Sequence, residues 1–220
     1  MSFDPVMPPY NASDPAARFL SASCLDFLLI ELVPMAYRVT NELGAAAREQ
    51  EGLLQGGGSG SAAAAAGASA GAGTGTGTTV MDEQEEREAV FWRLERIGYR
   101  LTDGPLSRFS RDRPRFNDTL DVIKFLCKDL WTIVFRKQVD NLKTNHRGVY
   151  VLTDNSFRPF SRMSAEVGSQ AVIRAQPFLW FPCGIVRGAL AALGITATVH
   201  AETTELPGAV FQIKTLSTKP

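Results

Sequence analysis

The side chains able to do acid–base or thiol chemistry are few and widely spaced in this sequence. It contains two histidines, His146 and His200, and three cysteines, Cys24, Cys127 and Cys183. His146 falls in a predicted hairpin turn and His200 on the polar side of a predicted strand, so we expect neither to transfer protons. HExxH, CxxC, GxSxG and GxxxxGK[ST] patterns do not occur. The sequence therefore predicts a protein that is not an enzyme and has no catalytic residues, metal site or cofactor.

The cysteines favour packing over reactivity. Cys127 falls on an apolar helical stripe, where a cysteine behaves as a small hydrophobic side chain. Cys24 and Cys183 also have apolar neighbours, and acylation of one of them stays open. A sparse, odd number of cysteines without a visible signal peptide is typical of reduced thiols in the cytosol.

The formal net charge is zero and the pI is about 6.7. This balance gives no general attraction to nucleic acid, so we expect no nucleic-acid partner. One local basic cluster lies within the neutral chain. It is either a solvated loop or a patch for lipid headgroups or an acidic partner. The cluster consists of Arg108, Arg111, Arg113 and Arg115.

Helical periodicity and capping residues predict four main helices. The first begins at Asp14-Pro15, an N-cap followed by proline at the first helical position, and ends near Leu43, before Gly44. Pro34 should kink this helix or divide it. The other three are predicted over 81–103, from Asn117 or Asp118 to about 135, and over 177–194.

Four strands follow from alternating polar and apolar residues. They are predicted over 138–144, 149–154, 197–202 and 209–214, with turns at 145–148 and 207–208. The segment 157–176 is predicted as a loop with a short helical stretch near 163–167. The order α-α-α-β-β-α-β-β predicts an α+β fold, in which a helical layer packs on one face of a four-stranded antiparallel sheet.

A low-complexity segment interrupts this pattern. Every residue from 56 to 79 is Gly, Ala, Ser or Thr, so no large side chain offsets the entropy of ordering it. We therefore predict a flexible tail over 1–12 and a single domain over 13–220. A disordered spacer over 52–80 interrupts that domain.

The first helix is apolar around most of its circumference, whereas a helix facing one core needs a single apolar stripe. Either a partner protein covers the surplus, or the second and third helices cover it within the chain. Burial yields on the order of 25 cal/mol per Å² of apolar surface, so a covered face contributes many kcal/mol. The partner hypothesis assigns the interface to Leu25, Leu28, Leu32 and Met35 of the first helix and Val90, Leu94 and Ile97 of the second.

Small residues recur every fourth position in the fourth helix. Glycine lowers helix propensity by about 1 kcal/mol relative to alanine, so repeated glycines indicate close approach of another backbone. Arg187 lies beside this strip, either paired with a carboxylate or extended along the surface. The strip consists of Gly184, Gly188 and Ala192.

Several segments resemble the subunit 6 family of the TRAPP (transport protein particle) complex. They are residues 120–131 (LDVIKFLCKDLW), 135–140 (FRKQVD), 142–148 (LKTNHRG) and 150–157 (YVLTDNSF). Cys183-Gly184 and the run 187–190 are similar to a motif of the wider family, which includes TRAPP subunits 3 and 5.

The resemblance implies a twisted sheet and dimerisation through the first two helices. It implies an architectural subunit that pairs with subunit 3 in a complex exchanging nucleotide on a Rab/Ypt GTPase. Its expected location is cytoplasmic, peripherally at Golgi and ER-to-Golgi membranes. One departure is Arg113-Pro114-Arg115, which stands where subunit 3 has an acylated cysteine. One alternative is a lipid- or ligand-binding module with an apolar channel beside the third and fourth helices. The other is a membrane-surface adaptor using the arginine cluster.

Overall fold

The computed structural model describes residues 21–55, 82–103, 116, 118–145, 147–163 and 168–216. Its helical elements are α1 (Ala22–Gln55), α2 (Glu83–Asp103), α4 (Thr119–Phe125), the π-helical turn η1 (Leu126–Leu130), α5 (Trp131–Phe135), the 3-10 turns η2 (Arg158–Phe160) and η3 (Gln176–Leu179), α6 (Gly168–Ala175) and α7 (Trp180–Ala192). The strands are β1 (Asn141–Asn145), β2 (Val149–Asp154), β3 (Ala197–Glu202) and β4 (Ala209–Thr215).

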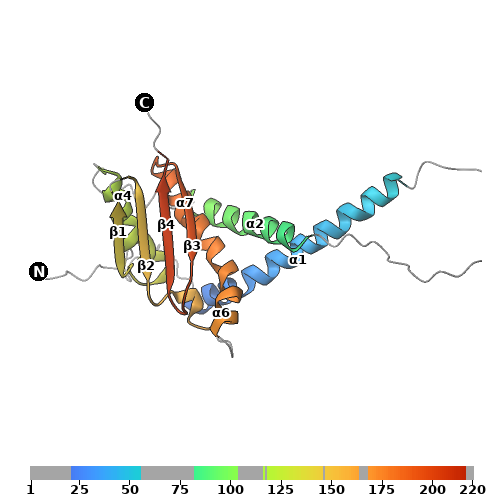
Figure 1. Cartoon of the computed structure of the whole chain (residues 1–220), viewed down its shortest axis with the longest axis horizontal. Helices are drawn as coiled ribbons and strands as arrows, with labels where there is room; N and C mark the ends of the chain where they lie inside the picture. The colour runs from blue at the N-terminus through green and yellow to red at the C-terminus, as the bar shows by residue number, and fades with distance from the viewer. Residues whose placement is uncertain are drawn as a thin grey trace, which may run out of the picture.

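The strands form one antiparallel sheet in the order β1-β2-β4-β3 (Figure 1). Leu152 of β2 lies opposite Phe211 of β4, which in turn lies opposite Ala201 of β3, and all three are buried. On the other face the opposed residues His200 and Gln212 are exposed. One face of the sheet therefore carries the helices, and the predicted α+β fold is confirmed.

Helix α1 is longer than the sequence analysis predicts. It continues through Pro34 and past the expected stop at Gly44 to Gln55, which extends it into the predicted spacer. A single glycine does not end it because the following residues, rich in Ala, Glu, Gln and Leu, are strong helix formers. The rest of the spacer (56–80) and the predicted tail lie outside the described residues.

The segment 157–176 is more helical than predicted. It contains η2 and all of α6, where only a short helical stretch near 163–167 was expected; residues 164–167 are outside the described part. Because η2 and α6 are short, their apolar residues do not repeat often enough to reveal a helical period in the sequence. Strand β1 also begins at Asn141, not at 138, because residues 136–140 form the turn that leaves α5.

An aromatic cluster joins the helical layer to the sheet. The indole of Trp131 packs edge-on against Phe211 of β4, with ring centroids 5.1 Å apart, and lies 4.7 Å from Phe135. Phe157 packs against Phe135 at 4.9 Å and against Phe160 at 5.2 Å. These five side chains are almost fully buried, so the cluster forms the centre of the core.

A buried carboxylate secures the same region. Trp131 donates its indole N–H to Asp154 at 2.8 Å, and Lys137 donates to the other oxygen of Asp154 at 2.5 Å. Lys137 also bonds Asp140 at 2.9 Å, and Asp140 accepts the backbone N–H of Asn155 at 2.7 Å. Because Asp154 is buried at the end of β2, this network fixes the β1–β2 hairpin to the end of α5.

Helices α2 and α7 pack at the distance that glycine allows. A Cβ atom on Gly184 would overlap the carbonyl group of Glu95, and one on Gly188 would overlap that of Tyr99. Gly98 of α2 is packed in the same way against α7. The predicted strip therefore makes the close contact at Gly184 and Gly188. The prediction is wrong for Ala192, which is exposed at the end of α7.

We predict that Gly184→Ala destabilises the protein although alanine is the better helix former. The added methyl group has to displace the backbone at Glu95, and overpacking of this kind costs about 1–3 kcal/mol. The free energy of unfolding from urea titration measures the effect. Ala192→Ser on the exposed end of the same helix is the control, and we expect it to change stability by less than about 0.5 kcal/mol.

A second prediction concerns acid stability. The backbone N–H of Asn155 and then the ammonium group of Lys137 lower the pKa of Asp140 below 3.8. A lowered folded-state pKa contributes stability above the unfolded value, and this contribution is lost as the pH falls through the folded pKa. Asp140→Asn should therefore be less stable than the wild type at pH 7, with the difference shrinking below about pH 4. The effect should be modest because 38% of the side chain is exposed. A constant difference in urea unfolding from pH 7 to pH 2.5 would contradict the assignment.

Candidate protein interface on helices α1 and α2

Helix α1 is only partly covered by its own chain. Its 34 residues span about 50 Å, and the C-terminal half extends beyond the other described helices and strands (Figure 1). Leu29, Val33 and Ala36 are buried on the side that faces the core. On the remaining circumference Phe27 is 70% exposed and Leu28 is 52% exposed. The other exposed large apolar side chains of this helix are Ile30, Met35 and Leu43.

The base of α1 is held by charge. Arg158 of η2 donates two hydrogen bonds to Asp26, at 2.9 and 3.1 Å, and Arg162 lies 3.6 Å from the same carboxylate. Asp26 and Arg158 are both largely shielded from solvent. This ion pair fixes the orientation of α1 about its axis at the level of Phe27 and Leu28, so their exposure follows from the fold.

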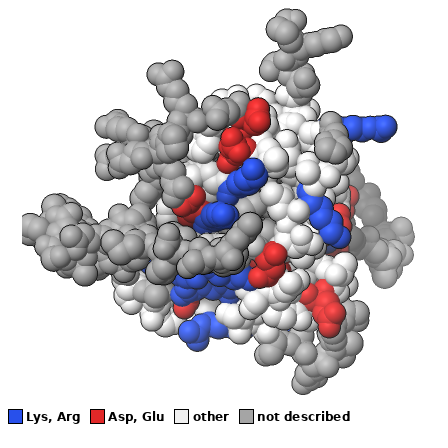
Figure 2. Space-filling model, turned by 90° about the vertical axis from the view of Figure 1, so that its left-hand side faces the viewer, with Lys and Arg blue, Asp and Glu red and all other residues white. Residues whose placement is uncertain are grey.

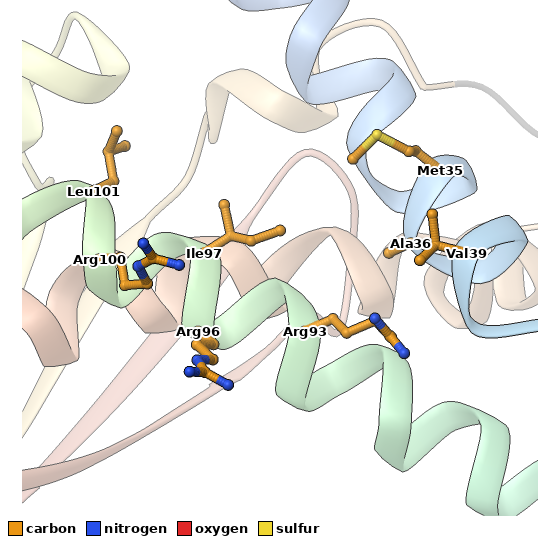
Figure 3. Close-up of a pocket in the computed structure, with 8 residues that line it drawn as sticks. All are labelled: Met35, Ala36, Val39, Arg93, Arg96, Ile97, Arg100 and Leu101. Atoms are coloured by element: carbon orange, nitrogen blue, oxygen red, sulfur yellow. The ribbon is translucent and has the colours of Figure 1, made fainter. Parts of the chain in front are cut away.

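Helix α2 adds a second exposed apolar edge. Trp92 is 61% exposed, Ile97 is 41% exposed and Leu101 is also exposed, although the helix is well packed on its other side. A pocket of about 680 Å³ lies between the two helices. In Figure 3, Met35 of α1 and Ile97 of α2 point toward the space between their helices. The pocket is lined by Met35, Ala36, Val39, Arg93, Arg96, Ile97, Arg100 and Leu101.

The structure divides the seven predicted interface residues into three groups, exposed, half-buried and buried. Leu28, Met35 and Ile97 are exposed and therefore accessible to a partner. Leu25 is half-buried against the core. The interface prediction is wrong for Leu32, Val90 and Leu94, because these side chains are buried within the chain. The sequence could not separate the groups, since α1 is apolar on both sides and only packing against α2 decides which side is covered.

The predicted interface omits five exposed apolar residues of α1 and α2, namely Phe27, Ile30, Leu43, Trp92 and Leu101. Phe27 and Ile30 belong to the run that made α1 apolar all round, so the signal was present. Trp92 lies four residues from both Glu88 and Arg96, so it shares their polar face of α2. A large aromatic residue on the polar side of an amphipathic helix is the signal that could have identified it.

A buried ion pair supports α2 from behind. Arg187 of α7 donates two hydrogen bonds to the carboxylate of Glu95, one from Nη2 at 2.8 Å and the other from Nε. The guanidinium group also stacks over the ring of Tyr99, 4.7 Å from its centre. Glu95 is buried and Arg187 is partly exposed. Of the two roles considered for Arg187, the paired one is therefore correct.

The remaining candidates are the cysteines, the histidines and the arginine cluster, and those that the structure describes do not come together in a reactive site. Burial raises the pKa of Cys127 to about 12 and also raises the pKa of Cys183, so neither thiol ionises readily. Cys24 is exposed on α1, not packed among apolar neighbours. His200 faces solvent on β3 as predicted, and His146 is outside the described residues. So is the whole arginine cluster, Arg108, Arg111, Arg113 and Arg115.

The described ranges contain neither a candidate metal site nor a candidate membrane-spanning helix. Their His, Cys, Asp and Glu residues do not form a group of three placed to hold a metal ion. Within the same ranges, none of the helices combines the length and the apolarity required to cross a lipid bilayer. Figure 2 shows Lys and Arg side chains interspersed with Asp and Glu on the face that lies at the left of Figure 1. Where its residues are described, that face has no large region of one charge.

Comparison with known proteins first identifies the class of fold. The crystal structure of a trafficking protein particle complex subunit 3 from Naegleria fowleri, covalently bound to palmitic acid, superposes with a TM-score of 0.50. The match covers 60% of this chain and 82% of that chain at 12% sequence identity. The chain therefore has the α+β fold of this small TRAPP subunit.

The family follows from the sequence. The family model for the transport protein particle (TRAPP) component matches residues 25–216. Trafficking protein particle complex subunit 6b of Danio rerio is 51% identical over 121 residues, 55% of this chain and 76% of that protein. Subunit 6B of Homo sapiens is 50% identical with 55% and 75% covered. An uncharacterised protein of Schizosaccharomyces pombe is 33% identical over 195 residues, 89% of this chain and 64% of that protein.

This chain belongs to the TRAPP component family, and the resemblance to subunit 6 predicted from its sequence is confirmed.

We predict that removing the partner of Glu95 is more harmful than removing the whole pair. Arg187→Met leaves a buried carboxylate without its guanidinium and should cost on the order of 2–3 kcal/mol, a value reduced here because Arg187 is partly solvated. The double variant Glu95→Gln/Arg187→Met should recover at least half of that loss in urea unfolding. Equal destabilisation of both variants would show that the ion pair itself, not the stranded charge, is important.

Proposed function

We propose that this protein is an architectural, non-catalytic subunit of a TRAPP tethering and Rab-exchange complex. It pairs with TRAPP subunit 3 through the exposed apolar side chains of α1 and α2. In this assembly it acts in ER-to-Golgi and Golgi vesicle transport, from the cytoplasmic side of these membranes. Contact with the Rab/Ypt GTPase is indirect, through other subunits.

The observation that carries this proposal is the unused apolar surface of α1. Phe27, Leu28 and Met35 are exposed although the same helix also supplies core residues. An apolar helical face left in water is a typical sign of a protein–protein interface. Family membership supports the same conclusion, because the relatives with about half of their aligned residues identical are named as subunits of one complex.

Helix α2 adds exposed apolar side chains to this surface. Trp92, Ile97 and Leu101 extend the exposed apolar area beyond α1. Tryptophan is among the residue types that most often dominate binding energy at interfaces. The half of α1 that extends beyond the other described helices and strands offers further length to a partner (Figure 1). The two helices that the family resemblance assigns to pairing thus carry most of the exposed large apolar side chains of the described residues.

The two alternative functions have less support. An apolar channel for a lipid was expected beside the third and fourth helices, whereas the pocket described above lies between α1 and α2. The membrane-adaptor hypothesis depends on the arginine cluster, which is outside the described residues. Both hypotheses stay predictions. Lipid co-purification tests the first, and liposome flotation tests the second.

We predict that Leu28→Asp or Ile97→Asp weakens pairing with subunit 3 at least about 100-fold. Each substitution places an unpaired carboxylate in the apolar contact, which costs about 3 kcal/mol or more. Both positions are exposed in the chain itself, so the variants should fold. The measurement is the dissociation constant from isothermal titration calorimetry with purified subunit 3.

The matched control is Leu216→Asp, directly after β4, where the leucine is 50% exposed and belongs to neither α1 nor α2. It introduces the same charge on an equally apolar surface residue, and we expect pairing to be unchanged. If Leu216→Asp is as harmful as the other two, or if the wild-type chain does not bind subunit 3, the proposed interface is wrong.

A further inference from the structure

We propose that the groove between α1 and α2 is built for a partner helix that carries carboxylates as well as apolar side chains, and that Arg93, Arg96 and Arg100 bind those carboxylates. This inference rests on the proposed function and adds to it the charge of the partner's contacting surface.

The groove combines two kinds of surface along one helix. Ile97 and Leu101 are one turn apart on α2, and α1 adds Met35 and Val39 on the opposite side. The three arginines follow the same length of α2 at spacings of three and four residues, so they form a row along one side of the helix. Figure 3 shows this row and the apolar side chains as parts of one site.

Within the part of the chain that the structure describes, none of the three arginines forms an ion pair, whereas Arg187, Arg158 and Lys137 all do. The Nε atom of Arg93 is buried and lacks a hydrogen-bond partner. An unsatisfied buried donor costs about 1–3 kcal/mol, and like charges three or four residues apart on a helix repel each other. These unfavourable features are relieved when an anionic partner binds.

The apolar half of the groove selects among anionic partners. A phosphate or an acidic loop would neutralise the arginines but would leave Ile97, Leu101 and Met35 exposed. A helix with apolar residues on one stripe and Asp or Glu beside it satisfies both halves, because its residues repeat at the same three- and four-residue spacing. Arginine suits this role, since its planar group binds a carboxylate through two parallel hydrogen bonds.

A second copy of this chain fits the groove less well. A symmetric dimer brings the same patch of both subunits together, so two rows of arginines would lie close to one another. The exposed carboxylate of Glu31 on α1 is already bonded to Arg38 at 2.6 Å. The charge of the groove therefore opposes self-association and favours a different, acidic chain.

The test compares charge reversal in the groove with the same charge change elsewhere. The groove variant is Arg93→Glu/Arg96→Glu/Arg100→Glu. The control is Arg147→Glu/Arg174→Glu/Lys214→Glu, which reverses three exposed charges on other elements. Association and dissociation rates with purified full-length subunit 3 are measured by surface plasmon resonance between 50 and 500 mM salt. Arg96→Glu/Arg100→Glu, which spares the half-buried Arg93, is used if circular dichroism shows that the triple variant does not fold.

We expect the groove variant to associate at least about tenfold more slowly at 50 mM salt and to lose most of the wild-type salt dependence. The control should change the association rate by less than about threefold. Among single Asp→Lys and Glu→Lys variants in the first two helices of subunit 3, at least one should restore association with the groove variant. Equal kinetics of groove variant and control, or no restoring variant, would overturn the inference.

Other occupants give different results. Sedimentation velocity of the wild-type chain alone detects a homodimer, and one that Ile97→Asp dissociates would overturn the inference in favour of a second copy. Flotation with vesicles containing 20% phosphatidylserine tests a membrane. If the groove variant no longer floats with these vesicles but binds subunit 3 with unchanged kinetics, the inference is also overturned. If wild-type chain does not bind subunit 3 at all, the proposed function fails; if it binds and the arginines are irrelevant, only this inference fails.

Discussion

The close contact between α2 and α7 determines which surfaces this chain offers. Gly98, Gly184 and Gly188 let the two backbones approach until any added Cβ atom would overlap a carbonyl or hydroxyl group. The Glu95–Arg187 pair fixes the rotation of α2 about its axis at this contact. With one side of α2 committed to α7, the opposite side has to face outward. Trp92, Ile97 and the arginine row therefore become surface residues.

The position of α1 depends on that arrangement. Val90 and Leu94 of α2 are fully buried and, with Leu29, Leu32 and Val33 of α1, belong to one core. Asp26 and Arg158 hold the first turns of α1 against η2. After these contacts are made, a helix of 34 residues with apolar residues around its circumference still has uncovered surface. Hydrophobic burial is the dominant favourable term in association, so the exposed face of α1 is best explained by another polypeptide.

Much of the fold could be predicted because its residues act locally. Alternation of polar and apolar residues located β3 at 197–202, and the left-handed Gly194 follows α7 as the predicted helix stop. Elements that depend on distant contacts were less predictable. Helix α6 has too few residues to show a period, and the end of α1 at Gln55 reflects the propensity of many residues against one glycine. The hydrogen bonds from Trp131 and Lys137 to Asp154 left no pattern in the sequence, because the three residues come from separate parts of the chain.

The sequence alone determined the order of the main helices and strands, the sheet's polar and apolar faces, the close packing at Gly184 and Gly188, and the family resemblance. These properties are encoded by periodicity, by residue size and by short runs of adjacent residues. Only the tertiary structure decided which side of α1 and α2 is buried, that Arg187 pairs with Glu95, and that Arg93, Arg96 and Arg100 lie in a groove without carboxylates. A helix that is apolar on all sides has no preferred inner face of its own. Its orientation is set by the elements that pack against it, and these come from distant parts of the chain.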